Sequence, residues 1–417
     1  MDRLLGFGPL FAFLLPLAAM SETPDRHDLR VAIDISYVDT KGLPSWTEGS
    51  VGKLRYDDGS DGLILSRAFV DYSLKLADTI SASFAVEFYD DDLGGIADFT
   101  EAYVEWRPLP SSANRYRFKL GAFYPNISLE NTGASWSSPY TMNLSAINTW
   151  VAEELRTVGA EASVSRRPDM FGGLHIFSLH GVVFWSNDPA GSLLAWKGWS
   201  LHESRFGDKL PLPPLPQIAS GMMFEAQDPF VAPFREVDGR AGYYLNGSWR
   251  FGNRVLLRAM HFDNRADPTA LEDGQYAWAT RFDHVGLQMT LPADIGVIFQ
   301  WMRRSTVMGP RINGPHAVDV EYDSNFLLLT KSLGKHRLSA RYDHFEVAQN
   351  DHTPEDNNPE NGHAWTVSYQ MAYTEYATLA VEWLRVQTHH CGWAYYGIDP
   401  DATEQQLQIS LRLRFGN

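Results

Sequence analysis

The C-terminal segment 405–417, QQLQISLRLRFGN, alternates strictly between large apolar and polar residues. The apolar positions are Leu407, Ile409, Leu411, Leu413 and Phe415, and the positions between them are Gln408, Ser410, Arg412 and Arg414. Successive side chains of a β-strand point to opposite faces, so the pattern predicts a strand with one apolar and one polar face. Such a polar face does not suit a packed core. Either the apolar face covers a core, or it meets lipid while the polar face lines a water-filled lumen.

The same alternation recurs along the chain in about sixteen segments, each near the ~10 residues that a tilted membrane strand needs. Clear examples are DLRVAIDISYVD (28–39), RYRFKLGAFY (115–124) and YATLAVEWLRV (376–386). The phase of the alternation is ambiguous around 172–186 and 276–291. Long amphipathic helices are not predicted, so the chain is expected to be all-β.

The gaps between these segments alternate between long and short. Long gaps fall around 40–61, 125–154, 187–239, 265–275, 306–317, 348–362 and 389–404, and short ones at 76–79, 251–253, 292–294, 333–335 and 374–376. A shortish gap at 91–98 departs from the rule. Outer-membrane barrels sort their connections in this way, with short periplasmic turns and long external loops, whereas a soluble sandwich has no reason to. The sequence therefore predicts a transmembrane, antiparallel up-and-down β-barrel of about sixteen strands.

Aromatic residues near strand ends fit the two interfacial girdles of such a barrel. They are Trp106, Trp185, Trp301, Trp383 and Tyr373. The terminal Phe415 is expected to let the last strand pair with the first, which leaves no open edge in lipid. A large secreted all-β protein is the alternative.

Residues 1–21 read as a secretory signal peptide, with Arg3 before an apolar run that ends near Ala19, and residues 22–417 as the barrel. An uncleaved anchor is the alternative. The expected location is the outer membrane of a Gram-negative bacterium, reached with the help of the outer-membrane assembly machinery. The formal net charge of −16 disfavours nucleic-acid binding, and the single cysteine, Cys391, excludes an intramolecular disulfide framework and a cysteine-based zinc cluster.

Two stretches resemble the phosphate-selective porins of Gram-negative outer membranes. They are SRAFVDYSLKLADTISASFAVEFYDDDLGGIADFTEAYVEWRP (66–108) and YRFKLGAFYPNISLENTGASWSSPY (116–140), followed by RTVGAEASV (156–164). The similarity covers roughly residues 62–166. It implies a sixteen-stranded, often trimeric channel, here a possible homotrimer, with a constriction made by an inward-folded loop.

Charged residues of both signs lie on the inferred lumen face. The candidate pore-lining residues are Arg67, Asp71, Lys75, Glu101, Glu105, Arg117, Lys119, Arg412 and Arg414, with Glu87, Asp319, Glu321 and Asp323 on the same inferred face. The resembled porins line their pores with clustered Arg and Lys, so phosphate selectivity does not follow here. Opposed charges create a transverse field that sorts solutes, or they neutralise one another; Glu101 and Glu105 are placed to pair with Arg117 and Lys119.

The loop at 125–155 is the third long gap and the predicted constriction. Its candidate residues are Glu130, Asn131, Trp136, Tyr140, Asn143, Asn148, Trp150, Glu153 and Glu154. Amides, hydroxyls and rings suit neutral polar solutes. The alternative is a surface loop that packs against neighbouring subunits. The proline-rich run KLPLPPLPQ (209–217) suits an external lid or trimer clasp, or is a plain extended loop.

The sequence thus predicts a porin for passive diffusion of small hydrophilic solutes and ions, without a cofactor. Alternatives are a substrate-specific channel for neutral or sugar-like solutes, a plugged structural barrel and a barrel enzyme. Asp283–His284 and Asp343–His344 are the dipeptides an enzyme could use, but strand neighbours point to opposite faces. A soft metal at His389, His390 and Cys391, and Ca²⁺ in the acidic loop 349–363, are considered and not predicted.

Overall fold

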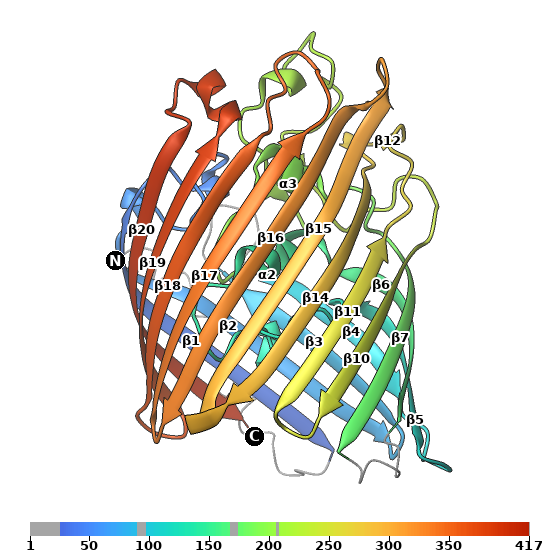
Figure 1. Cartoon of the computed structure of the whole chain (residues 1–417), viewed down its shortest axis with the longest axis vertical. Helices are drawn as coiled ribbons and strands as arrows, with labels where there is room; N and C mark the ends of the chain where they lie inside the picture. The colour runs from blue at the N-terminus through green and yellow to red at the C-terminus, as the bar shows by residue number, and fades with distance from the viewer. Residues whose placement is uncertain (1–25, 90–96, 167–173, 206–207, 417) are drawn as a thin grey trace.

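Sixteen antiparallel strands close into one barrel, in which each strand pairs with the strands before and after it and the last pairs with the first (Figure 1). This computed structural model describes residues 26–89, 97–166, 174–205 and 208–416. The barrel strands are β1 (His27–Lys41), β2 (Gly62–Ala77), β3 (Ile80–Phe88), β4 (Ala97–Trp106), β5 (Asn114–Phe123), β6 (Thr157–Arg166), β7 (His175–Trp185), β10 (Gly242–Phe251), β11 (Val255–Asp263), β14 (Ala279–Leu291), β15 (Ile295–Arg311), β16 (His316–Leu333), β17 (His336–Gln349), β18 (Glu360–Ala372), β19 (Ala377–His390) and β20 (Asp401–Gly416). The predicted fold class and strand number are confirmed. The predicted signal peptide lies outside the described residues.

Closure follows the predicted pairing of the chain ends. Phe415 of β20 lies opposite Val31 of β1, and Leu411 lies opposite Ile35. Because the backbone groups of β1 and β20 pair with each other, the junction of these two strands leaves no unpaired strand edge.

Small elements occupy the loops. They are α2 (Ala146–Glu154), α3 (Ser192–Trp196), the hairpins β8 (Leu210–Pro211) with β9 (Phe230–Val231) and β12 (Leu271–Glu272) with β13 (Gln275–Tyr276), and the 3-10 turns η2 (Trp46–Glu48), η3 (Asp58–Ser60), η4 (Ala134–Trp136), η6 (Pro216–Ile218), η7 (Pro292–Asp294) and η8 (Cys391–Tyr396). Among the residues that the structure describes, no helix has the length and apolar character to cross a membrane.

Long loops gather at one end of the barrel and short turns at the other (Figure 1). The predicted long gap at 306–317 is wrong. β15 runs to Arg311 and β16 begins at His316, and the turn between them closes with a hydrogen bond from Ile312 N to Pro315 O. Gly314 (φ 129°) supplies the backbone conformation that L side chains rarely adopt.

The outer face of the barrel is apolar around its middle. Leu120, Leu179, Leu245, Trp365 and Leu411 are 40–67 % exposed, and the residues next to them in sequence point inward. An apolar surface that encircles a protein is stable against lipid, not water. The terminal strand therefore has the predicted apolar outer face.

The barrel wall is taller on one side. β3 to β7, β10 and β11 have nine to eleven residues, whereas β14 to β20 have 13 to 18 and reach further toward the long-loop end (Figure 1). Asp319, Glu321 and Asp323 lie on the outer face of β16, because Val320 and Tyr322 between them are buried inside the barrel. Their predicted place in the lumen is wrong: the strand continues beyond the membrane, where an outer face can be charged.

Candidate functional site

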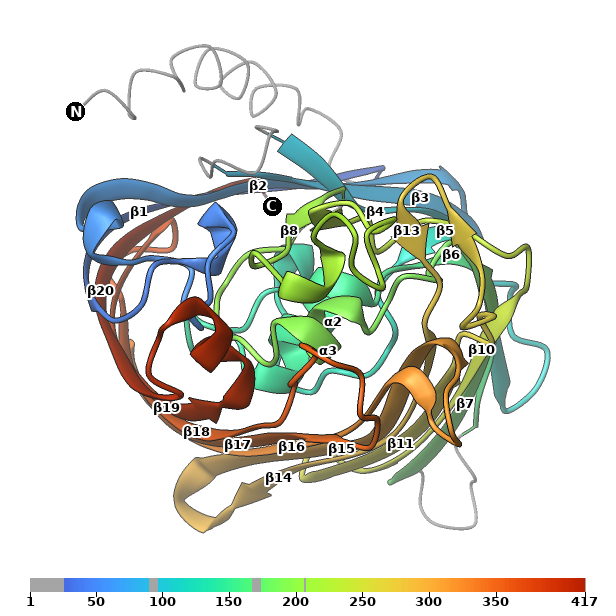
Figure 2. The same ribbon diagram turned by 90° about the horizontal axis from the view of Figure 1, so that it is seen from above.

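Three loops from the long-loop end turn into the barrel and fill its interior. They comprise residues 42–61, 124–156 and 186–205, and together are called the plug below. Figure 2 shows α2 and α3 inside the ring of strands, and every residue of both helices is buried. The loop that carries the predicted constriction residues therefore lies inside the barrel. Its role as a pore constriction remains a prediction.

α2 forms because its first turn is capped from within the same loop. The hydroxyl of Ser145 accepts a hydrogen bond from the backbone N–H of Asn148 (3.3 Å), and the Ser145 N–H donates to the Glu130 carboxylate (3.1 Å). At its other end, the Trp150 indole donates to Glu154 Oε2 (2.6 Å). These contacts join residues of the same loop and do not involve the barrel wall.

One side of the plug packs on the wall through apolar contacts. The Trp150 ring lies 5.2 Å from the Tyr322 ring of β16 and 5.7 Å from the Phe282 ring of β14. The inner faces of β10 to β17 join the same buried cluster with Tyr244, Phe262, Phe282, Met302, Tyr322, Phe326 and Phe345. The inner face of these strands is mixed and not purely polar as expected, because large apolar residues pack on the plug beside buried polar residues such as Gln300 and Arg341.

Buried charges pin the plug to the wall opposite its origin. Arg341 of β17 pairs with Glu130 (2.5 Å) and with Asp343 (2.7 Å), and donates to the carbonyls of Asn143 and Leu144 (both 2.8 Å). On β19, the Glu382 carboxylate accepts from the backbone N–H of Met142 (2.6 Å) and of Asn143 (2.8 Å). The loop thus leaves the wall at β5, crosses the lumen and is held on β17 and β19.

A second buried cluster joins two loops of the plug to each other. Glu153 of α2 pairs with Lys197 and accepts from His202 Nε2 (2.9 Å). Burial raises the pKa of Glu153, but the Lys197 ammonium and the His202 hydrogen bond outweigh burial and bring the pKa to about 2. Glu153 is therefore ionised, and the ion pair locks residues 186–205 onto α2.

Glu154, the next residue, has the opposite electrostatic environment. Its carboxyl group accepts from the backbone N–H of Leu193 (3.1 Å) in α3 and from the indole of Trp150. Burial raises the pKa of Glu154 to about 7, although these hydrogen bonds partly oppose the shift. The contact between α2 and α3 therefore changes charge near neutral pH.

The other side of the plug meets β2 to β5 through charged groups, and this boundary is called the seam below. Arg67 donates to Glu87 (2.8 Å), and Arg205 of the plug pairs with the same carboxylate (3.2 Å). Arg67 also donates to Ser135 O (3.2 Å) and Arg205 to Trp136 O (3.1 Å). The three charged side chains are 3, 2 and 1 % exposed, so the seam is closed at this level.

Below the seam, the interior opens to water at the short-turn end. A hollow of about 520 Å³ there is lined by residues of both charges, including Lys75, Glu105 and Arg107, beside Ser73 and Tyr103. Arg67 and Asp71 precede Ser73 and Lys75 on the inner face of β2, and Asp71 accepts from the backbone N–H of Ser135 (3.1 Å) in the plug. The hollow therefore leads toward the seam.

The remaining predicted pore residues of β4 and β5 also face the interior. Glu105 lies 3.6 Å from Arg117, which pairs with Glu161 (2.6 Å). The ammonium of Lys119 lies over the Tyr103 ring at 4.2 Å, and Glu101 accepts from the backbone N–H of Tyr124 (3.3 Å). Of the expected pairing between acidic and basic residues of these strands, the Glu105–Arg117 contact is present, and the Glu101 carboxylate instead receives the loop backbone.

Arg412 and Arg414 on β20 differ in their surroundings. Arg412 makes two hydrogen bonds with Asp34 of β1 (2.7 and 2.6 Å), so its charge is matched within the wall. Arg414 lies two residues nearer the short-turn end, is exposed, and donates to Thr378 at 3.4 Å.

The polar groups of the predicted constriction are mostly engaged by protein partners. Asn143 binds Glu382, and Asn148 binds Glu130 (2.8 Å). The Trp136 ring stacks on Tyr124 at 4.6 Å, and the guanidinium of Arg337 lies over Tyr140 at 5.5 Å. Asn131 differs, because neither amide atom of its buried side chain has a hydrogen-bond partner within the described ranges. In this arrangement these groups hold the plug and do not line open water.

Several residues that build the interior were missed by sequence reasoning. They are Lys197, His202, Arg205, Arg341 and Glu382. The strand residues among them have a signal, since Arg341 and Glu382 occupy inward positions in alternating segments. The loop residues have no such signal, because no pattern in residues 186–205 predicts that this loop folds into the barrel.

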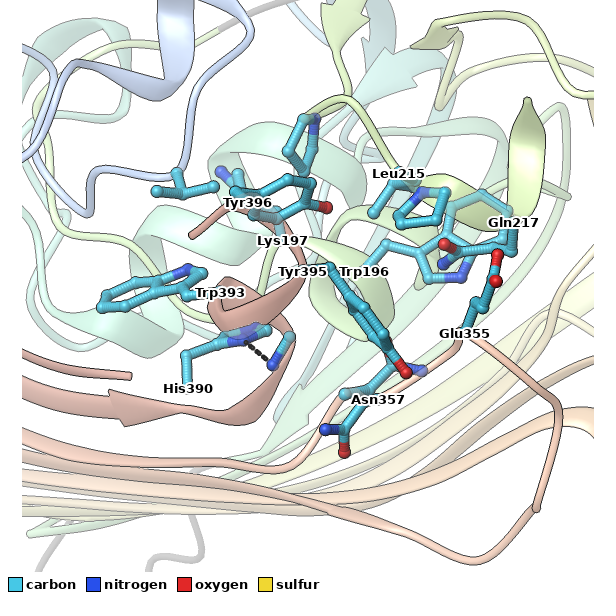
Figure 3. A pocket seen from close by; sticks show the side chains of 15 residues that line it. Trp196, Lys197, Leu215, Gln217, Glu355, Asn357, His390, Trp393, Tyr395 and Tyr396 are labelled. Carbon is cyan, nitrogen blue, oxygen red and sulfur yellow. Dashed lines mark hydrogen bonds between the residues drawn. The ribbon is translucent and has the colours of Figure 1, made fainter. Parts of the chain in front are cut away.

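Above the plug, the proline-rich run, the acidic loop 349–363 and the turn η8 meet at the mouth of the barrel (Figure 3). Trp393 of η8 stacks on His390 at 5.5 Å, and Gln217 and Leu215 face them from the proline-rich run. The cavity between them measures only about 10 Å³. Leu210, Leu212 and Leu215 belong to the same apolar cluster as the plug, so this run rests on the plug.

Carboxylates gather at two places in the outer loops. Asp188, Glu236 and Asp238 bring oxygen atoms within 4.8 Å of one another, and each accepts a backbone N–H of its own loop region. In the acidic loop, Asp351 accepts from the N–H of Asp319 (2.8 Å) and of Thr353 (3.1 Å). Both sets of contacts order their loops.

The fold and the inward loops define a porin-like barrel. Known structures of this fold include the outer-membrane channel DcaP of Acinetobacter baumannii, with a TM-score of 0.53 at 11 % identity over 93 % of this chain and 96 % of that one. An anion-selective porin from Comamonas acidovorans has a TM-score of 0.50 at 12 % identity, covering 93 % and 99 %. OmpF of Salmonella typhi, in complex with daunomycin, has a TM-score of 0.50 at 8 % identity, covering 93 % and 97 %. No family model matches the sequence, and no similar curated protein was found. The likeness at these identities is one of fold.

Proposed function

We propose that this protein is an outer-membrane, porin-type channel for small hydrophilic solutes and ions, and that its plug restricts conduction. One observation carries the proposal: the plug packs on β10 to β16 mainly through large apolar side chains and is held on β17 by Arg341, whereas it meets β2 to β5 through charges next to an open hollow. Separating a charged contact exposes groups that water solvates well, whereas separating the apolar contact exposes large rings. The seam is therefore the path of least cost for a solute.

Arg67, Glu87 and Arg205 close this path where the plug meets β2 and β3. Two cations and one anion leave a net positive charge there, which favours anions over cations when the side chains part. The hollow below, which contains Lys75, Glu105 and Arg107, gives both ions a hydrated approach. Conduction is then expected to be small in the resting state and to be set by these three side chains.

The test is a comparison of two triple variants in planar bilayers. In the first, Arg67, Glu87 and Arg205 are all replaced by Ala, which opens the seam without leaving an unpaired buried charge. In the matched control, Arg303, Arg304 and Asp283 are replaced by Ala; this set also has two arginines and one acid, and lies on the exposed outer surface. The seam variant should conduct severalfold more than the parent and lose its anion preference, and the control should conduct like the parent. Equal conductance of parent and seam variant would place the path elsewhere.

A plugged structural barrel is the second candidate, favoured by the continuous burial at the level of α2. It predicts that the parent and both variants are electrically silent in folded form. The enzyme alternative has weaker support: Asp343 points inward to Arg341 while His344 lies on the outer face, and His284 points inward to Gln300 while Asp283 lies outside.

Three further features belong to the proposal. We propose that the protein lies in the outer membrane of a Gram-negative bacterium, that it assembles as a homotrimer, and that residues 1–21 are removed during maturation. N-terminal sequencing of the membrane-extracted protein tests the last, and the mass of the detergent-solubilised particle tests the second.

A further inference from the structure

Three side chains form a chain of contacts on the outer face of the barrel, at its long-loop end. His389 near the end of β19 lies directly opposite Asp401 at the start of β20, and Cys391 is the first residue of the connecting turn η8. His389 Nδ1 is 2.9 Å from Asp401 Oδ1, and His389 Nε2 is 3.7 Å from Cys391 Sγ. The imidazole thus contacts the carboxylate with one nitrogen and the thiol with the other.

This arrangement suits proton transfer rather than metal binding. A metal ion needs ligand atoms that converge on one point, whereas Cys391 and Asp401 contact opposite nitrogens of the same ring. His390 does not join them, because it points into the barrel, where its Nδ1 accepts from Gly392 N (3.2 Å) and its ring stacks on Trp393. His389, His390 and Cys391 therefore do not converge on a common metal position.

We propose that Cys391 is a reactive thiol that exchanges with external disulfides, with His389 as its general base and Asp401 as the residue that positions His389. A base within reach of a nucleophile, itself oriented by a third group, is the arrangement that activates weak nucleophiles. This proposal does not depend on whether the barrel conducts.

The exchange step balances without a cofactor. Cys391 Sγ attacks one sulfur of a disulfide and passes its proton to His389 Nε2, and the Asp401 carboxylate stabilises the imidazolium. A bond forms between Sγ and that sulfur while the disulfide bond breaks. The departing thiolate then takes the proton from His389, so that one thiol and one disulfide yield a mixed disulfide and a new thiol.

Disulfide exchange fits the backbone around Cys391 better than acyl transfer does. Acyl transfer needs free N–H groups for an oxyanion. The N–H of Cys391 already donates to Pro359 O (2.9 Å) and that of Gly392 to His390 Nδ1. Exchange produces a thiolate that needs no such donors.

The charges and exposure of the residues around Cys391 also determine which disulfides are expected to react. His389 is 40 % exposed and Asp401 78 % exposed, so small molecules reach the imidazole edge. Asp399 adds a second carboxylate next to Asp401, whose N–H it accepts at 3.0 Å. Two carboxylates repel anions, so neutral or cationic disulfides are the expected substrates.

The experiment follows thiopyridone release from 4,4′-dithiodipyridine, a neutral disulfide, by the folded protein in detergent. Cys391 is the single cysteine, so Cys391→Ser should release nothing. His389→Ala should react at least about a hundredfold more slowly than the parent, the low end for loss of a general base. His363→Ala, which removes another outward-facing histidine, should react like the parent.

Asp401 is tested by rescue. Asp401→Asn should slow the reaction severalfold and Asp401→Glu should restore most of it, because the carboxylate is kept. In urea, where the three residues are separated, all cysteine-containing variants should react alike. The proposal is overturned if folded His389→Ala reacts as fast as the parent, or if Asp401→Asn and Asp401→Glu have the same rate.

Discussion

Replacing Arg341 by Leu should destabilise the plug more than any surface substitution of the same type. The guanidinium is fully buried, pairs with Glu130 and Asp343, and donates to two loop carbonyls. Leu fills part of the space but leaves two carboxylates buried without their cation. Breaking a buried ion pair from one side costs ~3–5 kcal/mol. Because Glu130 and both carbonyls belong to the loop, most of this cost should appear as release of residues 129–146 from β17.

The assay combines urea unfolding of the barrel in lipid vesicles, followed by tryptophan fluorescence, with conductance in planar bilayers. Arg341→Leu should lower the free energy of unfolding and raise conductance together. The triple variant Arg341→Leu, Glu130→Gln, Asp343→Asn should recover much of the stability, because no charge is left unpaired. A loss below about 1 kcal/mol, typical of an exposed pair, would refute the buried network as an anchor of the plug.

Leu411→Arg should cost ~2–4 kcal/mol in urea unfolding because it puts a charge on the lipid face near the midplane, whereas Arg414→Leu, on the inner face, should cost far less; equal losses would mean that the two faces are exchanged. Glu154 has a pKa raised from 4.5 to about 7, so the folded plug binds a proton more tightly than the unfolded chain, and this group's contribution to stability is present below pH 4.5 and is lost as the pH rises through 7. The difference in unfolding free energy between parent and Glu154→Gln should follow that curve, and a difference that is flat between pH 4.5 and 7.5 would contradict the shift. Shortening the loop between Ser128 and Ala152 should leave the barrel assembled, as judged by its gel mobility, while raising conductance and the size limit in sugar-uptake assays; an unchanged channel would show that this loop does not limit the path.

Much of the barrel could be predicted because its information is local. Alternation along each strand sets which side chains face outward, and the order of long and short gaps sets the direction of the strands. The prediction failed where strands continue beyond the membrane. Residues 306–317 contain two Gly-Pro pairs, Gly309–Pro310 and Gly314–Pro315, and resembled a loop, and the outward charges Asp319, Glu321 and Asp323 resembled lumen residues. Alternation along a strand does not show which part of that strand lies within the bilayer.

The interior was predicted less well because its contacts are distant in sequence. Nine candidate pore residues were placed on inward positions by parity. Their partners were not: Glu87 pairs with Arg67 and also with Arg205 of the plug, and Asp34 pairs with Arg412 across the closure of the barrel. The loop residues Glu130 and Asn143 were predicted as constriction residues, yet in the structure they bind Arg341 and Glu382 of the barrel wall.

The sequence by itself determined a membrane barrel of about sixteen strands, because period-two alternation gives each strand one apolar and one polar face, and the order of long and short gaps is that of an outer-membrane barrel. Only the tertiary structure decided that the lumen is filled. Arg341 meets Glu130 across 211 residues of chain, and Lys197 meets Glu153 from a different loop. Such pairs exist only once the barrel has closed and brought opposite walls within reach of the loops, since a buried charge is stable only beside the partner that closure supplies.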